Sequence, residues 1–275
     1  MMNPSIQFGH YWGQHAITTN KSQYWQLGPL HLWIEHLPHQ WKVAWTHEKE
    51  WLGSQHRHES NFDSALIPED AHRVTCVFGN LTHERLSFSP TLPNRPVVTR
   101  FANPLHVLPG EDLNVYVLSP LYLRVETIEP SKVIHEIPIF RLSDTWFGPV
   151  GHSGELCYSS TSPAFLDIRT VPVRLHSVIS AVQIKNLGTD SLRLDKIKLP
   201  VPRLSLFYST RTGFWTDRVT LERRDDSELA TIKLDRQPPL EAAPSQFVTG
   251  PRSDSSSPKS VIRAFSAFFR DWSSL

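Results

Sequence analysis

Large apolar side chains recur at every second position in several parts of the first hundred residues. Four runs show this pattern: 30–34, 41–45, 74–78 and 86–88. A period of two is that of a β-strand with one face turned toward a core. Pro38 separates the first two runs, which we interpret as a hairpin, and Gly79-Asn80 is a turn signal that makes the last two a meander. We expect an antiparallel sheet up to about Phe101.

After Pro104 the same alternation returns. The runs that carry it are 113–118, 121–126, 178–184, 192–199, 204–208, 214–222 and 230–234. We interpret the first two as a hairpin. Many short strands with closely spaced turn signals are typical of a β-sandwich. The sequence therefore predicts a mainly β protein, with an N-terminal antiparallel β domain over residues 1–102 and an immunoglobulin-like β-sandwich domain over residues 103–236. One extended sandwich would give the same pattern.

The pattern changes in the C-terminal part of the chain. Residues 237–257 are rich in Pro and Ser and show neither period, so we expect a flexible linker. Ser257 is a suitable N-cap, and Pro258 suits the first position of a helix. At about 100° per residue, six large side chains fall on one side of a helix: Val261, Ile262, Phe265, Phe268, Phe269 and Trp272. Residues 258–275 are therefore predicted to form an amphipathic helix that binds a partner.

Three destinations stay open for the apolar side of this predicted helix. They are the body of the protein, a groove on a protein partner, and the membrane interface. On the polar side, Lys259, Arg263 and Arg270 outnumber Asp271, which suits a modest attraction to anionic lipid. A peripheral membrane contact through residues 258–275 is thus one of the expectations.

Composition narrows the function classes. Lys and Arg number 28 against 27 Asp and Glu, a balance that argues against a globally basic nucleic-acid binder. Cys76 and Cys157 fit neither a metal-ligand spacing nor a disulfide framework, so we expect reduced thiols, no metal and no cofactor. We find no secretory signal pattern and no apolar run of roughly 18 residues. We therefore expect a cytoplasmic protein, membrane-associated at most at the surface.

Few side chains suggest catalysis or metal binding. The cluster His56-Arg57-His58-Glu59 could supply two metal ligands, but spacing specifies no third or fourth ligand, and we interpret it as an exposed loop. Asp144 and Glu155 could form an acid/base pair, although such carboxylates more often cap turns. Four basic residues lie in one predicted hairpin and are interpreted as a solvated face: Lys185, Arg193, Lys196 and Lys198.

Several segments resemble a known family. Residues 141–149 read Arg-Leu-Ser-Asp-Thr-Trp-Phe-Gly-Pro, residues 154–158 read Gly-Glu-Leu-Cys-Tyr, and 199–206 and 214–216 add to the match. Over most of residues 8–235 the chain resembles the DUF432 family, a prokaryotic family of undetermined function. The motif residues are Arg141, Asp144, Trp146, Glu155, Cys157 and Tyr158. The resemblance implies no activity or cofactor. Genes of the family tend to lie beside genes for small-conductance mechanosensitive channels, and this position implies a channel as the partner.

Two adjacent aromatics, Trp146 and Phe147, stand in the motif before a Gly-Pro stop. We interpret them as a loop plug over the end of a sandwich core, with Asp144 capping the turn and Cys157 filling a small space in the core. The alternative is that this aromatic loop on a rigid β scaffold binds a partner.

These observations support three hypotheses about function. The first is a non-enzymatic binding or regulatory protein, an accessory of a membrane protein such as a small-conductance mechanosensitive channel. The alternative is a carbohydrate-active or hydrolytic enzyme using Asp144 and Glu155. The third is a purely structural module. We expect a protein partner and no nucleic acid.

Overall fold

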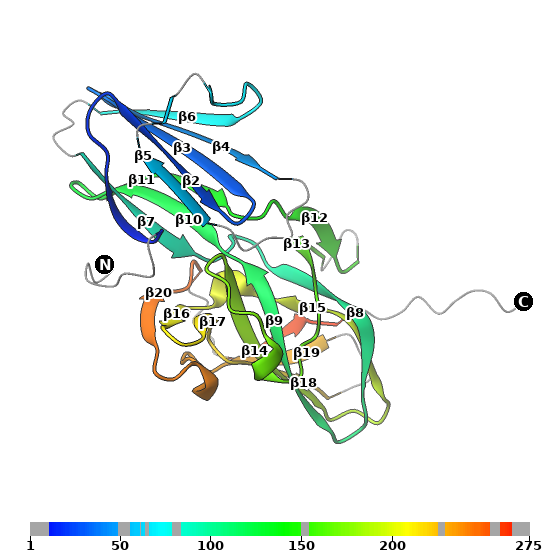
Figure 1. Cartoon of the computed structure of the whole chain (residues 1–275). Coiled ribbons are helices and arrows are strands. Elements are labelled where there is room, and N and C mark those ends of the chain that lie inside the picture. Colours follow the sequence, from blue (N-terminus) through cyan, green and yellow to red (C-terminus); the bar gives the residue numbers. More distant parts are fainter. Residues whose placement is uncertain are drawn as a thin grey trace, which may run out of the picture. The chain divides into compact units, whose positions relative to one another are not determined.

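Nearly all of the regular structure in this protein is β-strand (Figure 1). The computed structural model describes residues 11–48, 56–60, 62–63, 66–78, 84–149, 154–224, 229–253 and 259–265. The strands fall into two units, each assembled from three stretches of chain. Unit 1 comprises Met1–Thr91, Pro120–Arg141 and Arg174–His176, and unit 2 comprises Leu92–Ser119, Leu142–Val173 and Ser177–Leu275. This division differs from the predicted boundary near residue 102.

Unit 1 contains two antiparallel sheets. The first has the order β5-β2-β3-β4-β6 and the second the order β1-β7-β10-β11. Their strands are β1 (Gly13–Ala16), β2 (Lys21–Leu27), β3 (Leu30–Leu37), β4 (Gln40–His47), β5 (His56–Ser60), β6 (His72–Val77), β7 (Arg85–Thr91), β10 (Tyr122–Thr127) and β11 (Lys132–Pro138).

Aromatic side chains join the two sheets of unit 1 face to face. The ring of Trp25 on β2 lies 5.0 Å from that of Phe88 on β7, and the ring of Trp45 on β4 lies 4.8 Å from that of His135 on β11. Such interdigitation of two inner faces defines a β-sandwich. Trp33 is also buried, because Phe62 and Ile67 cover the opposite face of its sheet. Burial on both faces explains why alternation along β3 is incomplete.

Unit 2 also contains two sheets. One has the order β12-β13-β8-β15, and the other has the order β20-β16-β17-β14-β18-β19-β21, with β9 paired to β14. Their strands are β8 (Val97–Val107), β9 (Asp112–Pro120), β12 (Ser143–Phe147), β13 (Glu155–Ser162), β14 (Ser177–Asn186), β15 (Leu192–Leu199), β16 (Leu206–Ser209), β17 (Gly213–Thr216), β18 (Val219–Arg223), β19 (Leu229–Leu234), β20 (Gln246–Thr249) and β21 (Lys259–Arg263).

In the described parts of the chain, helical structure is limited to short 3-10 turns. The ones in unit 2 are η2 (Ile168–Thr170), η3 (Val201–Arg203) and η4 (Leu240–Ala242). Within the described ranges no helix is long and apolar enough to cross a bilayer.

The strand class is predicted correctly, but several pairings are not. The hairpin of β3 and β4 is confirmed, with Leu37 opposite Gln40. The predicted meander over 74–88 is wrong, because β6 and β7 belong to different sheets, and the predicted hairpin over 113–126 is wrong, because β9 pairs with β14 while β10 pairs with β7 and β11. Unit 2 is also mixed rather than antiparallel, since β14 runs parallel to both β17 and β18.

The C-terminal segment forms a strand where a helix was predicted. β21 pairs antiparallel with β19, so Val261 lies opposite Thr231 and Ile262 opposite Ala230. Phe265 follows as an isolated bridge to Ile197 and is 2% exposed. The helix prediction is wrong for residues 259–265, because the backbone bonds offered by the edge of β19 outweigh a helical spacing of apolar residues that includes two β-branched ones. The other predicted helix residues, Phe268, Phe269 and Trp272, lie outside the described residues.

The segment expected as a flexible linker also contains regular structure. β20 pairs with β16, placing Phe247 opposite Phe207. Beyond β20 the Arg252 side chain donates to the carbonyl of Leu92 at 2.6 Å, and its amide donates to the carbonyl of Pro202 at 2.8 Å. Residues 237–253 are therefore part of unit 2. The weak alternation of apolar residues in this segment reflects a short edge strand rather than a linker.

We predict that Phe265→Ala lowers the free energy of unfolding by about 3–5 kcal/mol, because it empties a buried aromatic site. Phe247→Ala is the matched control, since Phe247 is 58% exposed and its loss costs about 1 kcal/mol. Denaturant melts of both variants measure this difference. Equal costs for the two variants would contradict the placement of Phe265 in the core of unit 2.

Candidate functional site

The family motif identified in the sequence forms an antiparallel strand pair at the edge of a sheet (Figure 1). β12 pairs with β13 so that Asp144 lies opposite Tyr158 and Trp146 lies opposite Leu156. Side chains alternate between the two faces of a strand. One face of the pair therefore carries these four residues, and the other face carries Thr145, Phe147, Glu155 and Cys157.

The second of these faces is buried at Phe147 and Cys157, whereas Thr145 and Glu155 on it are partly exposed. Phe147 and Cys157 pack with Val98 of β8 into a small apolar cluster. The ammonium groups of Lys196 and Lys198 on β15 each lie 5.5 Å from the centre of the Phe147 ring, a cation–π distance. Lys198 is itself buried and forms an ion pair with Glu155. The charge of Lys198 is thus balanced by the carboxylate next to this cluster.

Burial, reinforced by the neighbouring Glu155 carboxylate, raises the pKa of the Cys157 thiol to about 11. Lys198 acts in the opposite direction and does not offset these two effects. Because the thiolate is the reactive form of cysteine, Cys157 is suited to packing rather than to nucleophilic chemistry.

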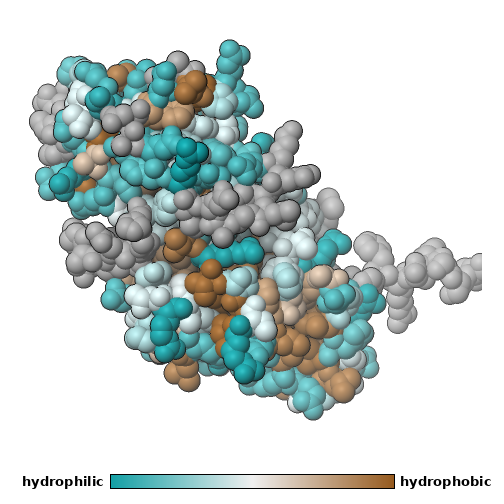
Figure 2. All heavy atoms as spheres, viewed as in Figure 1, coloured by the Kyte–Doolittle hydropathy of each residue, from teal (hydrophilic) through white to brown (hydrophobic). Residues whose placement is uncertain are grey.

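The first face is open to solvent. Trp146 is 48% exposed and Leu156 is 42% exposed, and they are direct cross-strand neighbours. Beside them, the guanidinium of Arg95 pairs with Asp144 at 3.0 Å and lies 5.3 Å from the centre of the Tyr158 ring. This exposed face of β12 and β13 is an apolar pair flanked by a polar cluster, and we call it the Trp146 face. Figure 2 shows other apolar side chains at the surface of unit 2.

The absence of a side chain at Gly154 lets the indole of Trp146 lie close to the backbone there. A methyl group at position 154 would overlap the Trp146 indole and the carbonyl of Pro149. The indole N–H of Trp146 also donates to the Pro149 carbonyl at 3.4 Å. The exposed indole is therefore packed against Gly154 and Pro149.

These positions correct the plug interpretation in part. Phe147 is buried, and Cys157 fills the small core as expected, but Trp146 lies on a strand and is half exposed, so it plugs no core. Asp144 caps no turn and instead pairs with Arg95. Alternation along the strand could have separated the two aromatics, had residues 143–147 been recognised as a strand rather than a loop.

Asp144 and Glu155 do not face a common cleft. They lie on opposite faces of the strand pair, and each is held by its own basic partner, Arg95 and Lys198 respectively. An acid/base pair needs both carboxylates to approach one substrate bond.

The other sequence candidates belong to other strands. Residues 56–59 belong to the edge strand β5 rather than a loop, and the exposed His58 ring stacks on Trp25. Among the described residues, no three His, Cys, Asp or Glu side chains gather as metal ligands do. The predicted basic hairpin is wrong, because β14 and β15 belong to different sheets, and its cations are dispersed: Lys185 pairs with Asp112, Arg193 with Asp195, and Lys198 with Glu155.

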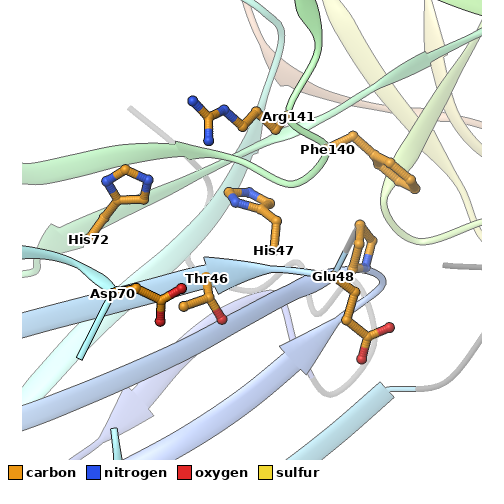
Figure 3. A pocket seen from close by; sticks show the side chains of 8 residues that line it. Thr46, His47, Glu48, Asp70, His72, Phe140 and Arg141 are labelled. Carbon is orange, nitrogen blue, oxygen red and sulfur yellow. The ribbon is translucent and has the colours of Figure 1, made fainter. Parts of the chain in front are cut away.

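Arg141, the first residue of the motif, lies in unit 1 and lines a cavity of about 420 Å³ (Figure 3). The lining residues are Pro29, Thr46, His47, Glu48, Asp70, His72, Phe140 and Arg141. They come from the turn between β2 and β3, the end of β4, the segment that leads into β6 and the segment after β11. No local sequence pattern joins these four segments, so apart from the high number of histidines nothing in the sequence indicated the cavity.

Several of the cavity's side chains have defined partners. His47 bonds through Nε2 to the carbonyl of Pro138 at 2.6 Å, and the ring of His72 stacks on Trp45 at 5.5 Å. Glu48 pairs with Nε2 of His31 at 2.9 Å. Burial lowers the pKa of His47, and the nearby His72 and Arg141 lower it further, although the bond to the Pro138 carbonyl acts in the opposite direction.

The described residues form a mainly β protein with an exposed apolar strand pair in unit 2 and a polar cavity in unit 1. A family model described as "Protein of unknown function (DUF432)" matches residues 11–270. The chain belongs to this family, as the resemblance at residues 141–158 indicated. A search of curated proteins found no match. A search of solved structures found none either.

We predict that substitution of the two adjacent aromatics destabilises the protein to different extents. Phe147→Ala lowers the free energy of unfolding by about 3–4 kcal/mol because it opens a cavity against Val98 and Cys157. Trp146→Ala costs about 1–2 kcal/mol, because half of its surface is already in water. Denaturant melts of the pair test this order. A Trp146→Ala variant as unstable as Phe147→Ala would restore the plug interpretation.

We also predict that Cys157 reacts slowly with thiol reagents. In a Cys76→Ser variant at pH 8, the native protein should react roughly 100-fold more slowly than the unfolded chain, since a pKa of about 11 leaves little thiolate. The complementary Cys157→Ser variant reports Cys76, which is half-buried and should react faster. Stopped-flow absorbance with a disulfide reagent measures both rates. Native and unfolded rates within a factor of about three in Cys76→Ser would contradict the burial of Cys157.

Proposed function

We propose that this protein is a non-enzymatic binding protein that docks an extended segment of a protein partner along β12. The observation that carries this proposal is the half-exposed Trp146 beside the exposed Leu156, on the outermost strand of its sheet. The partner segment adds as a further strand and covers these two side chains.

The edge of β12 supports this mode of binding. Among the described residues β12 pairs with β13 alone, so its other edge offers backbone donors and acceptors to an incoming strand. Natural proteins usually protect such edges with Lys, Pro or bulges. β12 instead carries a large aromatic at its exposed face, as expected for a strand that receives a partner.

Trp146 has the properties of a binding hot spot. Tryptophan supplies a large contact area with few rotatable bonds, and it is enriched among residues that dominate interface energies. Its contacts with Gly154 and Pro149 restrict the indole before binding, which lowers the entropy cost of association. The Arg95–Asp144 pair and Tyr158 then form a polar rim beside the anchor.

The partner we propose is a membrane protein, with a small-conductance mechanosensitive channel as the first candidate. This choice rests on what the family resemblance implies, and the protein would act as a cytoplasmic accessory that regulates the channel. The apolar anchor and the strand edge specify a segment that is extended and carries an apolar side chain opposite Trp146.

The experiment compares three full-length forms for binding to the purified channel in detergent. Wild type binds, and Trp146→Ala weakens binding by at least about 30-fold, which corresponds to a hot-spot loss of about 2 kcal/mol. Leu240→Ala is the control, since Leu240 is 88% exposed in the same unit and belongs to η4. Equal affinities of wild type and Trp146→Ala would contradict the role of the Trp146 face.

A second measurement identifies the surface without assuming the channel. A photo-reactive amino acid is placed at position 146 in one variant and at position 240 in another, and both are cross-linked in the native cell. We expect a discrete partner adduct at position 146 and none of that mass at position 240. Absence of any adduct specific to position 146 would overturn docking at β12, whereas an adduct with another protein would replace the channel as the partner.

A further inference from the structure

The cavity of unit 1 is lined by an arginine side chain that forms no ion pair within the described residues. Across the described parts of the chain, Arg141 takes part in no ion pair, whereas Arg124 in the same unit pairs with Glu136 at 2.7 Å. Arg141 is exposed, and it lines the cavity beside Phe140 (Figure 3). A guanidinium open to a cavity presents a planar set of donors that suits an oxyanion.

Two histidines lie near this guanidinium with their orientations set by other contacts. Because the Pro138 carbonyl can only accept, Nε2 of His47 carries the hydrogen in that bond, and Nδ1 holds the lone pair when the ring is neutral. Protonation of Nδ1 then creates a second donor. His72 is exposed, and its ring is held by stacking on Trp45.

We propose that Arg141, His47 and His72 form a binding site for the oxyanion group of a small ligand, a phosphate, sulfate or carboxylate. The guanidinium supplies a permanent charge, the His47 ring supplies a donor whose charge depends on pH, and the His72 ring supplies a further donor. This site is in unit 1 and is independent of the docking proposed for β12 in unit 2.

The two carboxylates of the cavity decide where the oxyanion lies. Glu48 is occupied by His31 and also accepts from Gln26 at 3.3 Å, so its charge is partly balanced. Asp70 has no ion pair within the described residues and lies on the other side of His47 from Arg141 in Figure 3. The oxyanion therefore occupies the Arg141 side, and the charge of Asp70 opposes its binding.

The charge of His47 makes this site sensitive to pH. The groups that face it are His31, His72 and Arg141, which are basic, and the acidic Glu48 and Asp70. Burial and the basic neighbours lower the pKa of His47, so the ring is neutral at pH 7 in the free protein. A bound oxyanion favours the protonated ring, and affinity therefore rises as the pH falls toward 5.5.

Sulfate is a suitable probe because its charge is constant over this range. The full chain is titrated with sulfate at constant ionic strength at pH 8 and pH 5.5, with calorimetry for affinity and histidine ring NMR signals for location. We expect binding that is at least fivefold tighter at pH 5.5, with shifts of the His47 and His72 signals. Parallel titrations with phosphate and acetate separate the tetrahedral oxyanions from the carboxylate.

Three variants test the roles of individual charges. Arg141→Gln weakens sulfate binding at least tenfold, while Arg85→Gln, an exposed arginine of β7 outside the cavity, leaves it unchanged. Asp70→Asn strengthens sulfate binding about threefold. This effect is opposite in sign to that of Arg141→Gln, and a loss of folding would not produce it. Equal sulfate affinity in wild type and Arg141→Gln, or shifts confined to histidines outside the cavity, would overturn the site. Trp146→Ala should bind sulfate with the affinity of the wild type. Either proposal can therefore be contradicted without affecting the other.

Discussion

The antiparallel pairing of β12 with β13 is the constraint on which the Trp146 face depends. Phe147 is inserted between Val98, Cys157 and two lysine side chains, and this buried contact sets the phase of the strand. Because neighbouring side chains point to opposite faces, burying Phe147 leaves Trp146 outside. A slip of one residue would exchange the two aromatics and bring the Asp144 carboxylate to the buried face. The exposed indole is thus a consequence of core packing on the other side of the sheet.

How far the fold could be predicted depends on whether the deciding interactions are local. The β class and the β3–β4 hairpin follow from alternation and a short turn, which act within a few residues. The partners of β6, β9 and β15 do not, because β6 lies in a different sheet from the following strand β7, and β9 and β15 lie in different sheets from both of their neighbours in sequence. The same reason explains the error at residues 259–265, where pairing with β19 overrides a helical spacing. The intrinsic propensity of a segment limits which secondary structures it can form. Pairing with a strand that is distant in sequence then determines which of them it adopts.

The sites show the same distinction. The motif at residues 141–158 located the β12–β13 pair, since its residues are close in sequence, but treating it as a loop concealed the two faces. The cavity of unit 1 was not foreseen, because Thr46, His72 and Arg141 come from three separate stretches that meet only in the folded unit. Arg141 was recognised as part of the motif, while its role in the cavity depends on its neighbours in space.

The division of the chain between the units has a consequence for synthesis and evolution. Unit 1 obtains its strands β10 and β11 from a stretch that follows more than twenty residues of unit 2 in the chain. A nascent chain that ends at Thr91 therefore has one complete sheet and a β7 strand that lacks its β10 neighbour. Unit 1 cannot finish folding on the ribosome until part of unit 2 has already emerged. Neither unit can be exchanged between genes by a single cut, so the two are inherited and assembled together.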